Sequence, residues 1–538
     1  MTLLSVRDLS VSIHGLPILS GVSFDMAAGE VFGLVGESGS GKSMTSLALM
    51  QLLPQGAVAG GRATMGGADL LALPERQMCA LRGREIGMIF QEPMTALNPV
   101  KTIGDQVAET LVIHGAASRG EALRVARARL DRVGLFADRF PLDRFPHELS
   151  GGQRQRVCIA MAVALRPKLL IADEPTTALD VTTQAQILDL LRDLVAEERM
   201  GLMLITHDLA VVAGMADHVA VMQAGRIVEA GRTEALFRTR REAYTRALFA
   251  ASGHQPSRQT TRTEKPLLEV TQADRSYPLP RPHPFARPPR FRAVKGVSFT
   301  LHEGESLGLV GESGCGKSTL ARAILGLDVL QGGAIRLGGE EVRAGHHMHR
   351  TMRAKMQAVF QDPYGSFNPR WRVDRAVAEP LHLLPEPPGD VPTRVAAALE
   401  EVGLSAKDGR KFIHEFSGGQ RQRIAIARAL ILRPKLIVLD EAVSALDVRV
   451  RAQVLDLLAD LQARHGLAYL FISHDLGVVR AITDRVLVMQ AGEIVEEGAT
   501  PRVFDAPAHP YTKTLVAATP RLPADWMEDA DADRQTVV

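Results

Sequence analysis

A glycine-rich stretch that occurs twice constrains this sequence more than any other feature. "GLVGESGSGKSMT" runs from Gly33 to Thr45, and "GLVGESGCGKSTL" runs from Gly308 to Leu320. Both contain GxxxxGK[ST], in which glycines let backbone N–H groups converge on phosphates. The lysine of this pattern reaches the terminal phosphates, and its last hydroxyl binds Mg²⁺. The predicted phosphate-binding residues are Gly36, Glu37, Ser38, Gly39, Ser40, Gly41, Lys42 and Ser43, and then Gly311, Glu312, Ser313, Gly314, Cys315, Gly316, Lys317 and Ser318.

The match between the two halves extends far beyond these loops, as a true duplication requires. Lys317 follows Lys42 at a shift of 275 residues, and Gln361 follows Gln91 at a shift of 270. From Ser150 onward the shift stays at 267 residues, for the pairs Ser150 and Ser417, Asp173 and Asp440, Asp180 and Asp447, and His207 and His474. We therefore predict two tandem domains of one kind, at residues 1–251 and 267–505.

The segments between the regular elements are polar or rich in proline. "ASGHQPSRQTTRTEKP" has no apolar periodicity and predicts a linker over 252–266. The prolines of "YPLPRPHPFARPPRFR", at about 278–292, exclude a regular helix or strand ladder. A solvated loop between two strands is one interpretation of that stretch, and a basic contact with a partner or membrane headgroups is the other.

Each half alternates short apolar runs with segments of helical periodicity. "VFGLVG", "KLLIAD" and "GLMLIT" predict buried strands, and "TTQAQILDLLRDLVAEE" predicts a helix. This alternation is typical of an α/β fold with a mainly parallel sheet. The segment "GDQVAETLVIHGAASRGEALRVARARLDRVGL" predicts a helical insertion between the glycine-rich loop and "ELSGGQRQR".

Composition excludes several classes of protein. The chain has 538 residues, 46% of them hydrophobic and 23% charged, which is ordinary for globular domains. A net charge of +2 gives no global field for nucleic acid. We find neither a membrane-spanning apolar run nor a signal peptide, so we expect a cytoplasmic chain. Cys79, Cys158 and Cys315 suggest reduced thiols, because they form neither a disulfide framework nor a CxxC pair.

Two carboxylates end an apolar strand in each half, in "KLLIADEP" and "KLIVLDEA". The first of each pair, Asp173 or Asp440, suits Mg²⁺ through water, and the second, Glu174 or Glu441, suits the polarisation of an attacking water. A buried strand end is a costly place for charge without such a role.

A second anion site is predicted in each half by "ELSGGQRQR" and "EFSGGQRQR", because a serine and two glycines precede a helix. The residues are Ser150, Gly151, Gly152 and Gln153, and Ser417, Gly418, Gly419 and Gln420. Each half already has its own phosphate loop, so this site is suited to the nucleotide of the other half.

Taken together, these motifs resemble the ATP-binding cassette family over nearly the whole chain. The resemblance implies ATP and Mg²⁺ as ligands, and two cassettes that hold two ATP molecules between the phosphate loop of one and the SGGQ of the other. It implies a parallel core sheet, an antiparallel β subdomain and a helical subdomain carrying SGGQ in each cassette. It assigns γ-phosphate and Mg²⁺ sensing to Gln91 and Gln361, γ-phosphate binding to His207 and His474, and cross-interface "ALD" loops to Asp180 and Asp447.

"FQEPMTALNP", "FQDPYGSFNP" and "HPYTKTLVAATPRL" are similar to the dipeptide, oligopeptide and nickel importers. The last element predicts a C-terminal extension over 506–538, of which the first half keeps only "REAYTRAL" at Tyr244. The similarity implies an ATPase at the cytoplasmic face of the inner membrane, with two membrane subunits and a binding protein as partners. The cargo stays open between peptides and others such as nickel or opines. A soluble double cassette acting on ribosomes or DNA is the alternative.

Three departures from the family pattern affect the predicted sites. No cysteine follows Cys315, so we expect no iron–sulfur cluster. Tyr277 is the candidate for stacking on adenine in the second half, whereas the first half offers only Ile13 or His14. Ala442 and Val443 replace Pro-Thr after the second carboxylate pair, which we interpret as tolerated variation.

The local sequence also allows interpretations of a histidine cluster and of the loops after Gln91 and Gln361. His346, His347 and His349 are compatible with a metal site or with an exposed polar loop. We expect the loops after Gln91 and Gln361 to receive short helices from the membrane subunits through Met94, Leu97, Tyr364 and Phe367, with local packing inside the cassette as the alternative. Both halves keep every lysine, carboxylate, glutamine and histidine named above, so we expect both to hydrolyse ATP.

Overall fold

The computed structural model describes residues 2–526 except for positions 178, 259–261, 280, 282, 284, 363–364, 387 and 445. The chain divides into two compact units. The first contains Met1–Leu179, Thr183–Gly253 and the chain from Pro520 on, and the second contains Asp180–Thr182 and His254–Thr519. The C-terminal residues thus belong to the first unit.

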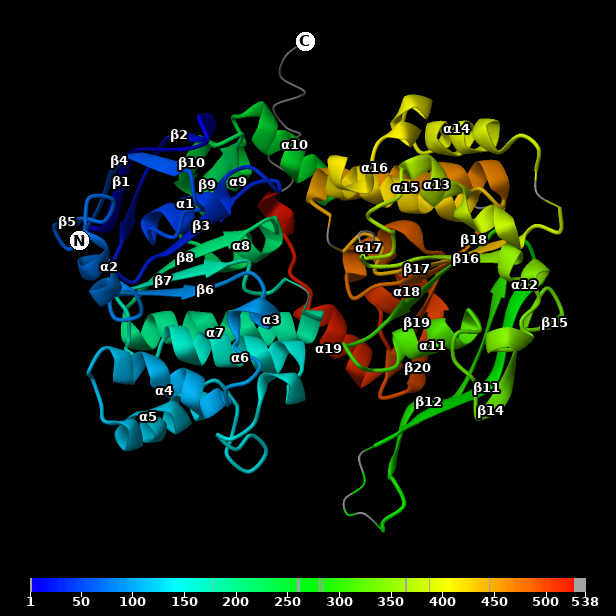
Figure 1. Cartoon of the computed structure of the whole chain (residues 1–538), viewed down its shortest axis with the longest axis horizontal. Coiled ribbons are helices and arrows are strands. Elements are labelled where there is room, and N and C mark those ends of the chain that lie inside the picture. Colours follow the sequence, from blue (N-terminus) through cyan, green and yellow to red (C-terminus); the bar gives the residue numbers. More distant parts are fainter. Residues whose placement is uncertain are drawn as a thin grey trace. The chain divides into compact units, whose positions relative to one another are not determined.

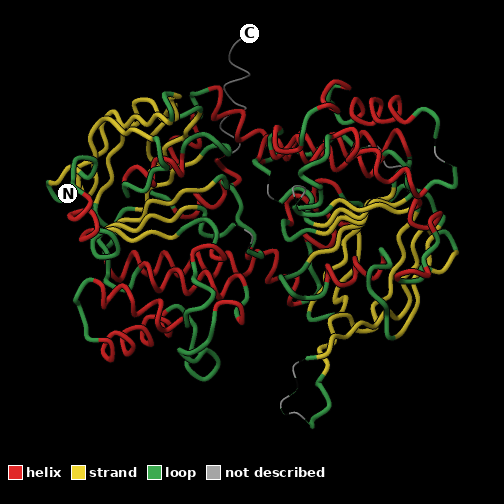
Figure 2. The backbone as a smooth tube through the Cα atoms, in the orientation of Figure 1, coloured by secondary structure: helices red, strands yellow, loops and turns green. Residues whose placement is uncertain are grey.

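Each unit contains one four-stranded and one six-stranded sheet (Figure 2). In the first unit the antiparallel sheet has the order β2(Leu16–Ala27), β1(Thr2–Ile13), β4(Ala57–Met65), β5(Ala68–Asp69). The larger sheet has the order β10(Arg226–Arg232), β9(His218–Gln223), β3(Val31–Val35), β8(Gly201–Thr206), β7(Leu169–Asp173), β6(Ile86–Ile89). Only β10 runs antiparallel to its neighbour in this larger sheet.

The second unit repeats this arrangement. Its antiparallel sheet has the order β12(Arg290–His302), β11(Pro266–Pro278), β14(Gly332–Leu337), β15(Glu340–Glu341). Its larger sheet has the order β16(Met356–Val359), β17(Leu436–Asp440), β18(Ala468–Ile472), β13(Ser306–Val310), β19(Arg485–Gln490), β20(Glu493–Ala499). The predicted α/β class, with a mainly parallel core and an antiparallel subdomain, is confirmed.

The central strands form because their residues are apolar on both faces. Every residue of β3, β7 and β8 is buried, as expected for parallel strands covered by helices on both sides. These are the strands predicted from "VFGLVG", "KLLIAD" and "GLMLIT".

The predicted helical insertion consists of α4(Ile103–Ile113) and α5(Arg119–Arg132). Figure 1 shows them on one side of the larger sheet, with α6 and α7 between them and its strands. The first unit also contains α1(Lys42–Leu49), α2(Glu75–Leu81), α3(Pro93–Ala96), η1(Pro146–Glu148), α6(Gly151–Ala162), α7(Val181–Glu198), α8(Leu209–Met215), α9(Thr233–Thr239) and α10(Ala243–Ser252).

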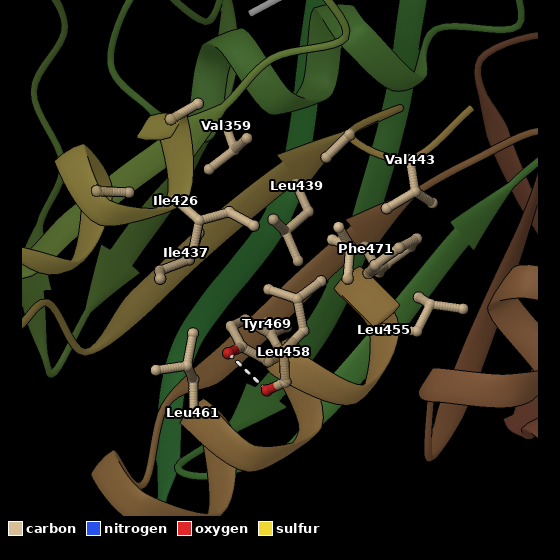
Figure 3. Packing of buried hydrophobic residues seen from close by; sticks show 14 of the residues in the cluster. Val359, Ile426, Ile437, Leu439, Val443, Leu455, Leu458, Leu461, Tyr469 and Phe471 are labelled. Atoms are coloured by element: carbon tan, nitrogen blue, oxygen red, sulfur yellow. Dashed lines mark hydrogen bonds between the residues drawn. The ribbon is translucent and has the colours of Figure 1, made fainter. Parts of the chain in front are cut away.

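The helices of the second unit are α11(Lys317–Ile324), η2(Gly345–His347), α12(Arg350–Lys355), α13(Val373–Ala378), η3(Glu379–Leu383), α14(Val391–Glu401), η4(Ala406–Arg410), η5(Ile413–Glu415), α15(Gly418–Leu430), α16(Val448–His465), α17(Leu476–Ile482), α18(Thr500–Asp505) and α19(Pro510–Ala518). In the core between α16 and the sheet, Tyr469 is fully buried (Figure 3). Its hydroxyl donates a hydrogen bond to the Leu458 carbonyl at 3.0 Å, which satisfies the polar end of an otherwise apolar cluster.

The prediction that residues 278–292 form no strand ladder is wrong at both ends of that stretch, because Pro278 of β11 pairs with Arg290 of β12. Helix α10 ends at Ser252 and β11 begins at Pro266, around the segment predicted to be a linker. Strand β11 ends at Pro278 and β12 begins at Arg290, and the Leu279 N–H donates to the Pro289 carbonyl at the base of the loop between them. None of the helices in the described part of the chain has both the length and the apolarity that a membrane crossing needs.

Candidate active site

The first glycine-rich loop connects β3 to α1. The Lys42 ammonium, 5% exposed, lies inside this loop and donates to the carbonyls of Gly36 at 2.8 Å and Glu37 at 3.0 Å. Gly41 precedes the helix with φ 104°, in the left-handed region, and a Cβ there would lie 2.5 Å from Leu19 Cδ2. The position therefore favours glycine, and the N-terminus of α1 adds the positive potential that phosphate binding uses.

The second loop, between β13 and α11, has the same geometry. Lys317 donates to the carbonyls of Gly311 at 2.7 Å and Glu312 at 2.8 Å. Gly316 has φ 114°, and a Cβ there would lie 2.2 Å from the Ala293 carbonyl oxygen. The two units thus have the same loop geometry, which is suited to an anion.

Ser43 and Asp173 come together at the end of β7. The Ser43 hydroxyl donates to Asp173 Oδ1 at 3.1 Å. Burial raises the pKa of Asp173 to about 6, although the hydrogen bond from Ser43 opposes this rise. A hydroxyl and a carboxylate are hard oxygen ligands of the kind Mg²⁺ prefers, so these residues fit that ion.

Glu174 is held by three side chains. Its carboxylate lies 3.3 Å from His207 Nδ1 and accepts hydrogen bonds from Gln91 Nε2 at 2.9 Å and from Thr177 Oγ1 at 3.0 Å. Burial acts to raise its pKa, but the His207 hydrogen bond and the charges of His207 and Lys42 outweigh it and lower the pKa to about 2. The carboxylate is therefore ionised at neutral pH.

The backbone of Glu174 is unusual, with φ 47° in the left-handed region. Glu441 has φ 51° at the equivalent position. The N–H of Glu174 donates to the Ile205 carbonyl and that of Glu441 to the Ile472 carbonyl, both at 2.9 Å. A non-glycine residue in this region stores about 1–3 kcal/mol of strain, which the neighbouring strand holds in place.

The second unit arranges its carboxylates in the same way. Burial raises the pKa of Asp440 to about 6, and the charge of Glu441 adds to the rise. Glu441 lies 3.2 Å from His474 Nδ1. Burial opposes ionisation of both, but their mutual attraction lowers the pKa of Glu441 and raises that of His474. Gln361 follows β16, which pairs with β17, as Gln91 follows β6.

The SGGQ motifs form helix N-termini. Ser150 caps α6: its hydroxyl accepts from the Gln153 N–H at 3.4 Å, and its own N–H donates to Gln153 Oε1 at 3.0 Å. Ser417 and Gln420 make the same reciprocal bonds at 3.4 and 3.1 Å at the start of α15. Both serines are exposed, so the two helix ends are accessible on their units.

Two aspartates lie in the "ALD" loops. Asp447 caps α16 and accepts a hydrogen bond from the Val450 N–H at 3.1 Å. Asp180 is buried, and its carboxylate accepts from the Thr182 hydroxyl at 2.8 Å.

The structure describes the surroundings of Tyr277 and the exposure of His347 and His349. The Tyr277 hydroxyl donates to Asp328 Oδ2 at 2.9 Å, and the Arg275 guanidinium lies 4.5 Å from the Tyr277 ring centroid.

His347 and His349 are exposed, while the side chain of His346 lies outside the described residues. Nowhere in the described part of the chain do three His, Cys, Asp or Glu side chains group as metal ligands would.

The expected partner surface needs correction. Leu97 is only 3% and Phe367 only 6% exposed, and both pack in the cores of their units. Tyr364 lies outside the described residues, and Met94 is exposed. The apolar residues of these loops turn inward because the insertion helices offer them a core, so exposure was wrongly predicted for Leu97 and Phe367.

One pair of residues in contact with the phosphate loops was missed. The Tyr244 hydroxyl of α10 accepts a hydrogen bond from the Glu37 N–H at 3.2 Å, and the Tyr511 hydroxyl of α19 accepts from the Glu312 N–H at 2.9 Å. A signal existed in the shared "YT" of "REAYTRAL" and "HPYTKTL", which repeats at the 267-residue shift.

The model of the family described as "ABC transporter" matches residues 19–177 and 294–444. The chain belongs to this family and carries two ATP-binding cassettes. A second model, for the C-terminal region of oligopeptide and dipeptide transporters, matches residues 495–536.

Several curated proteins are similar along almost their whole length. A peptidoglycan transport ATP-binding protein of Agrobacterium fabrum is 49% identical over 527 residues, which cover 96% of each chain. A glutathione import ATP-binding protein of Escherichia coli is 46% identical over 560 residues, covering 96% of this chain and 89% of its own. Among solved structures, CbiO1 of Clostridium perfringens is 26% identical over 45% of this chain and 92% of its own, with a TM-score of 0.40. The chain is an ATP-hydrolysing subunit of an ABC transporter.

Proposed function

We propose that this chain drives the import of peptides or peptide-derived compounds by hydrolysing ATP for two integral membrane permease subunits. A single observation carries the proposal: two ABC transporter domains share a chain with a C-terminal region like that of oligopeptide and dipeptide transporters. The names of the similar proteins, for peptidoglycan transport and glutathione import, support peptide-type cargo. A substrate-binding protein would deliver that cargo to the permease, and the chain would act at the cytoplasmic face of the membrane.

The residues of each unit divide the chemistry among them. Lys42 and Lys317 would bind the terminal phosphates of ATP. Ser43 with Asp173, and Ser318 with Asp440, would hold Mg²⁺, which supplies charge neutralisation at the phosphates when bound. Glu174 and Glu441 would polarise the attacking water, and His207, His474, Gln91 and Gln361 would sense and hold the γ-phosphate.

The SGGQ helix ends would complete each site for the nucleotide of the other cassette. Their exposed N-termini are suited to anions, and each unit already has a phosphate loop of its own. Disulfide trapping tests this pairing. Cysteines replacing Ser38 and Ser417 should cross-link in the presence of ATP, Mg²⁺ and the Glu174→Gln substitution, which blocks hydrolysis at the site that these two residues flank. Absence of a nucleotide-dependent cross-link would contradict the arrangement.

A groove of about 320 Å³ in the second unit is suited to a permease segment. It is lined by Leu325, Leu327, Met348, Phe360, Pro380 and Leu383, with Arg353, Glu379 and Arg428 among its polar residues. Leu327 is 57% and Phe360 38% exposed, which leaves apolar surface available to a partner. A short amphipathic helix of a membrane subunit is the partner we assign to it.

Copurification from membranes tests the proposal. We expect the tagged chain to retain two integral membrane proteins, and Leu327→Glu to release at least one of them while basal ATP hydrolysis stays unchanged. Val58→Glu, at a position on β4 that is 67% exposed, is the control. Uptake of labelled dipeptides, oligopeptides and nickel by cells with and without the chain then identifies the cargo. Copurification with ribosomes or DNA, and no membrane partner, would overturn the proposal.

A further inference from the structure

A tyrosine from a C-terminal helix contacts the phosphate loop in each unit, at the second residue of the loop. The Tyr511 hydroxyl accepts from the Glu312 N–H at 2.9 Å, and the Tyr244 hydroxyl accepts from the Glu37 N–H at 3.2 Å. Each tyrosine side chain is only 7% exposed. The same contact is present in both compact units.

The same loop residue also anchors the lysine. The carbonyl of Glu312 accepts from Lys317 Nζ at 2.8 Å, and that of Glu37 accepts from Lys42 Nζ at 3.0 Å. Each glutamate backbone is therefore held at both polar ends, by tyrosine at its N–H and by lysine at its carbonyl. An N–H that donates to tyrosine is already satisfied, so the later N–H groups of the loop are the ones available to an anion.

The tyrosine rings are fixed against the strand that carries the loop. Tyr244 packs in one cluster with Val35, the last residue of β3, and with Leu209 of α8. Tyr511 lies in the core cluster that contains Val310, the last residue of β13. Little freedom remains for either hydroxyl, because the ring is immobilised by packing.

A carboxylate fixes the helix that carries each tyrosine. Glu496 of β20 accepts from the N–H groups of Ala508 at 2.8 Å and His509 at 3.0 Å, just before α19. Glu229 of β10 accepts from the N–H groups of Arg241 at 3.0 Å and Glu242 at 3.3 Å, just before α10. A path of defined contacts thus leads from the antiparallel edge strand, through the helix N-terminus and the tyrosine, to the phosphate loop.

We propose that Tyr244 and Tyr511 are positioning residues for ATP binding, each of which fixes the loop residue that anchors the catalytic lysine of its own cassette. The tyrosines do not touch the nucleotide. They keep the backbone of Glu37 or Glu312 in place when the lysine moves to the phosphates. The inference rests on nucleotide binding by the cassettes and is independent of the cargo proposed above.

The test measures one cassette at a time in the full chain. Tyr511→Phe is placed in a Lys42→Ala background, so that binding of a fluorescent non-hydrolysable ATP analogue with Mg²⁺ reports the second cassette. We expect three- to tenfold weaker binding, as the loss of one hydrogen bond predicts. The KM for ATP should rise by the same factor, with kcat within twofold of its parent. Tyr244→Phe in a Lys317→Ala background should weaken binding of the analogue to the first cassette by the same factor.

Two controls separate positioning from stability. Tyr511→Phe in the Lys317→Ala background should leave binding to the first cassette unchanged, because the effect is local. Thr514→Ala removes a hydroxyl from the exposed side of α19 and should change nothing. Hydrogen–deuterium exchange should show faster exchange in the loop peptide of the altered cassette only. A lower melting temperature with unchanged ATP affinity and unchanged loop exchange would show that the tyrosine is only structural, and would overturn the inference.

Discussion

Arg485 and Glu305 form an ion pair at 2.8 Å in which the glutamate side chain is completely buried. The other oxygen of Glu305 accepts from the N–H of His302 at 2.8 Å and lies 2.9 Å from its ring. The first unit has Glu30 at this position, 2.7 Å from His218, so the second unit replaces a histidine partner with arginine. Because arginine is permanently charged, breaking the Arg485–Glu305 pair costs more free energy than breaking the His218–Glu30 pair.

Glu305→Gln should therefore destabilise the second unit by about 3–5 kcal/mol, because the Arg485 charge loses its buried partner. Burial opposes ionisation of Glu305, but the bonds from His302 and Arg485 lower its pKa below the ordinary value of 4.5. Its stabilisation is thus fully present above pH 4.5 and is lost as the pH falls further. Chemical unfolding at pH 7 and pH 4 checks this, with a smaller difference between the two expected in the variant. Glu497→Gln, at the exposed second partner of Arg485, should cost less than 1 kcal/mol.

We predict that both ATP sites hydrolyse. Glu174→Gln should slow the first site, and Glu441→Gln the second, by ~10²–10³, since each removes one well-placed group. Single-turnover hydrolysis with the membrane partners present measures each variant. Independent sites would leave about half of the activity in each single variant, and coupled sites much less. If Glu441→Gln abolished all cleavage and Glu174→Gln left the wild-type rate, the first site would be a regulatory clamp and the prediction wrong.

The two loop glycines should differ in their tolerance of alanine. At Gly41 the new Cβ meets a flexible leucine side chain at 2.5 Å, whereas at Gly316 it meets the Ala293 backbone oxygen at 2.2 Å. Gly316→Ala should weaken ATP binding by more than tenfold, and Gly41→Ala by less. Gly314→Ala is the control, because its left-handed φ of 79° is strained but its Cβ meets nothing within 4 Å. Equal effects of the three changes on ATP affinity would contradict the steric argument.

The C-terminal residues should stabilise the first unit. Trp526 packs edge-on against Phe237 with ring centroids 6.1 Å apart, and its carbonyl accepts from Arg240 Nη2 at 2.7 Å. Asp525 forms an ion pair with Arg238. Trp526→Ala should cost the first unit about 1–2 kcal/mol and leave the second unit unchanged. Limited proteolysis of the two units, followed by mass spectrometry, distinguishes this from a global effect.

The sequence predicted those parts of the fold that depend on local chemistry. The glycine loops, the buried strands and the helices after SGGQ were found because each needs particular residue types within about ten positions. The insertion helices were confirmed for the same reason, since α4 and α5 show helical periodicity.

Features that depend on distant partners were not predictable in this way. The hydrogen bond between Tyr244 and Glu37 joins residues 207 positions apart, and no local pattern specifies it. An apolar residue in a polar loop is equally compatible with burial and exposure, so Leu97 was assigned to the wrong side. The packing of Trp526 on Phe237 depends on where the chain goes after α19, which sequence periodicity does not determine.

The return of the chain to the first unit has a consequence for biosynthesis. Residues 520–526 are synthesised after the whole second cassette, yet they belong to the unit that is translated first. The packing of the first cassette therefore stays incomplete, with the surface of Phe237 uncovered, until the second cassette has been synthesised. A gene split at the linker would give an N-terminal product that never receives its last packing residues, unless they are supplied as a separate peptide.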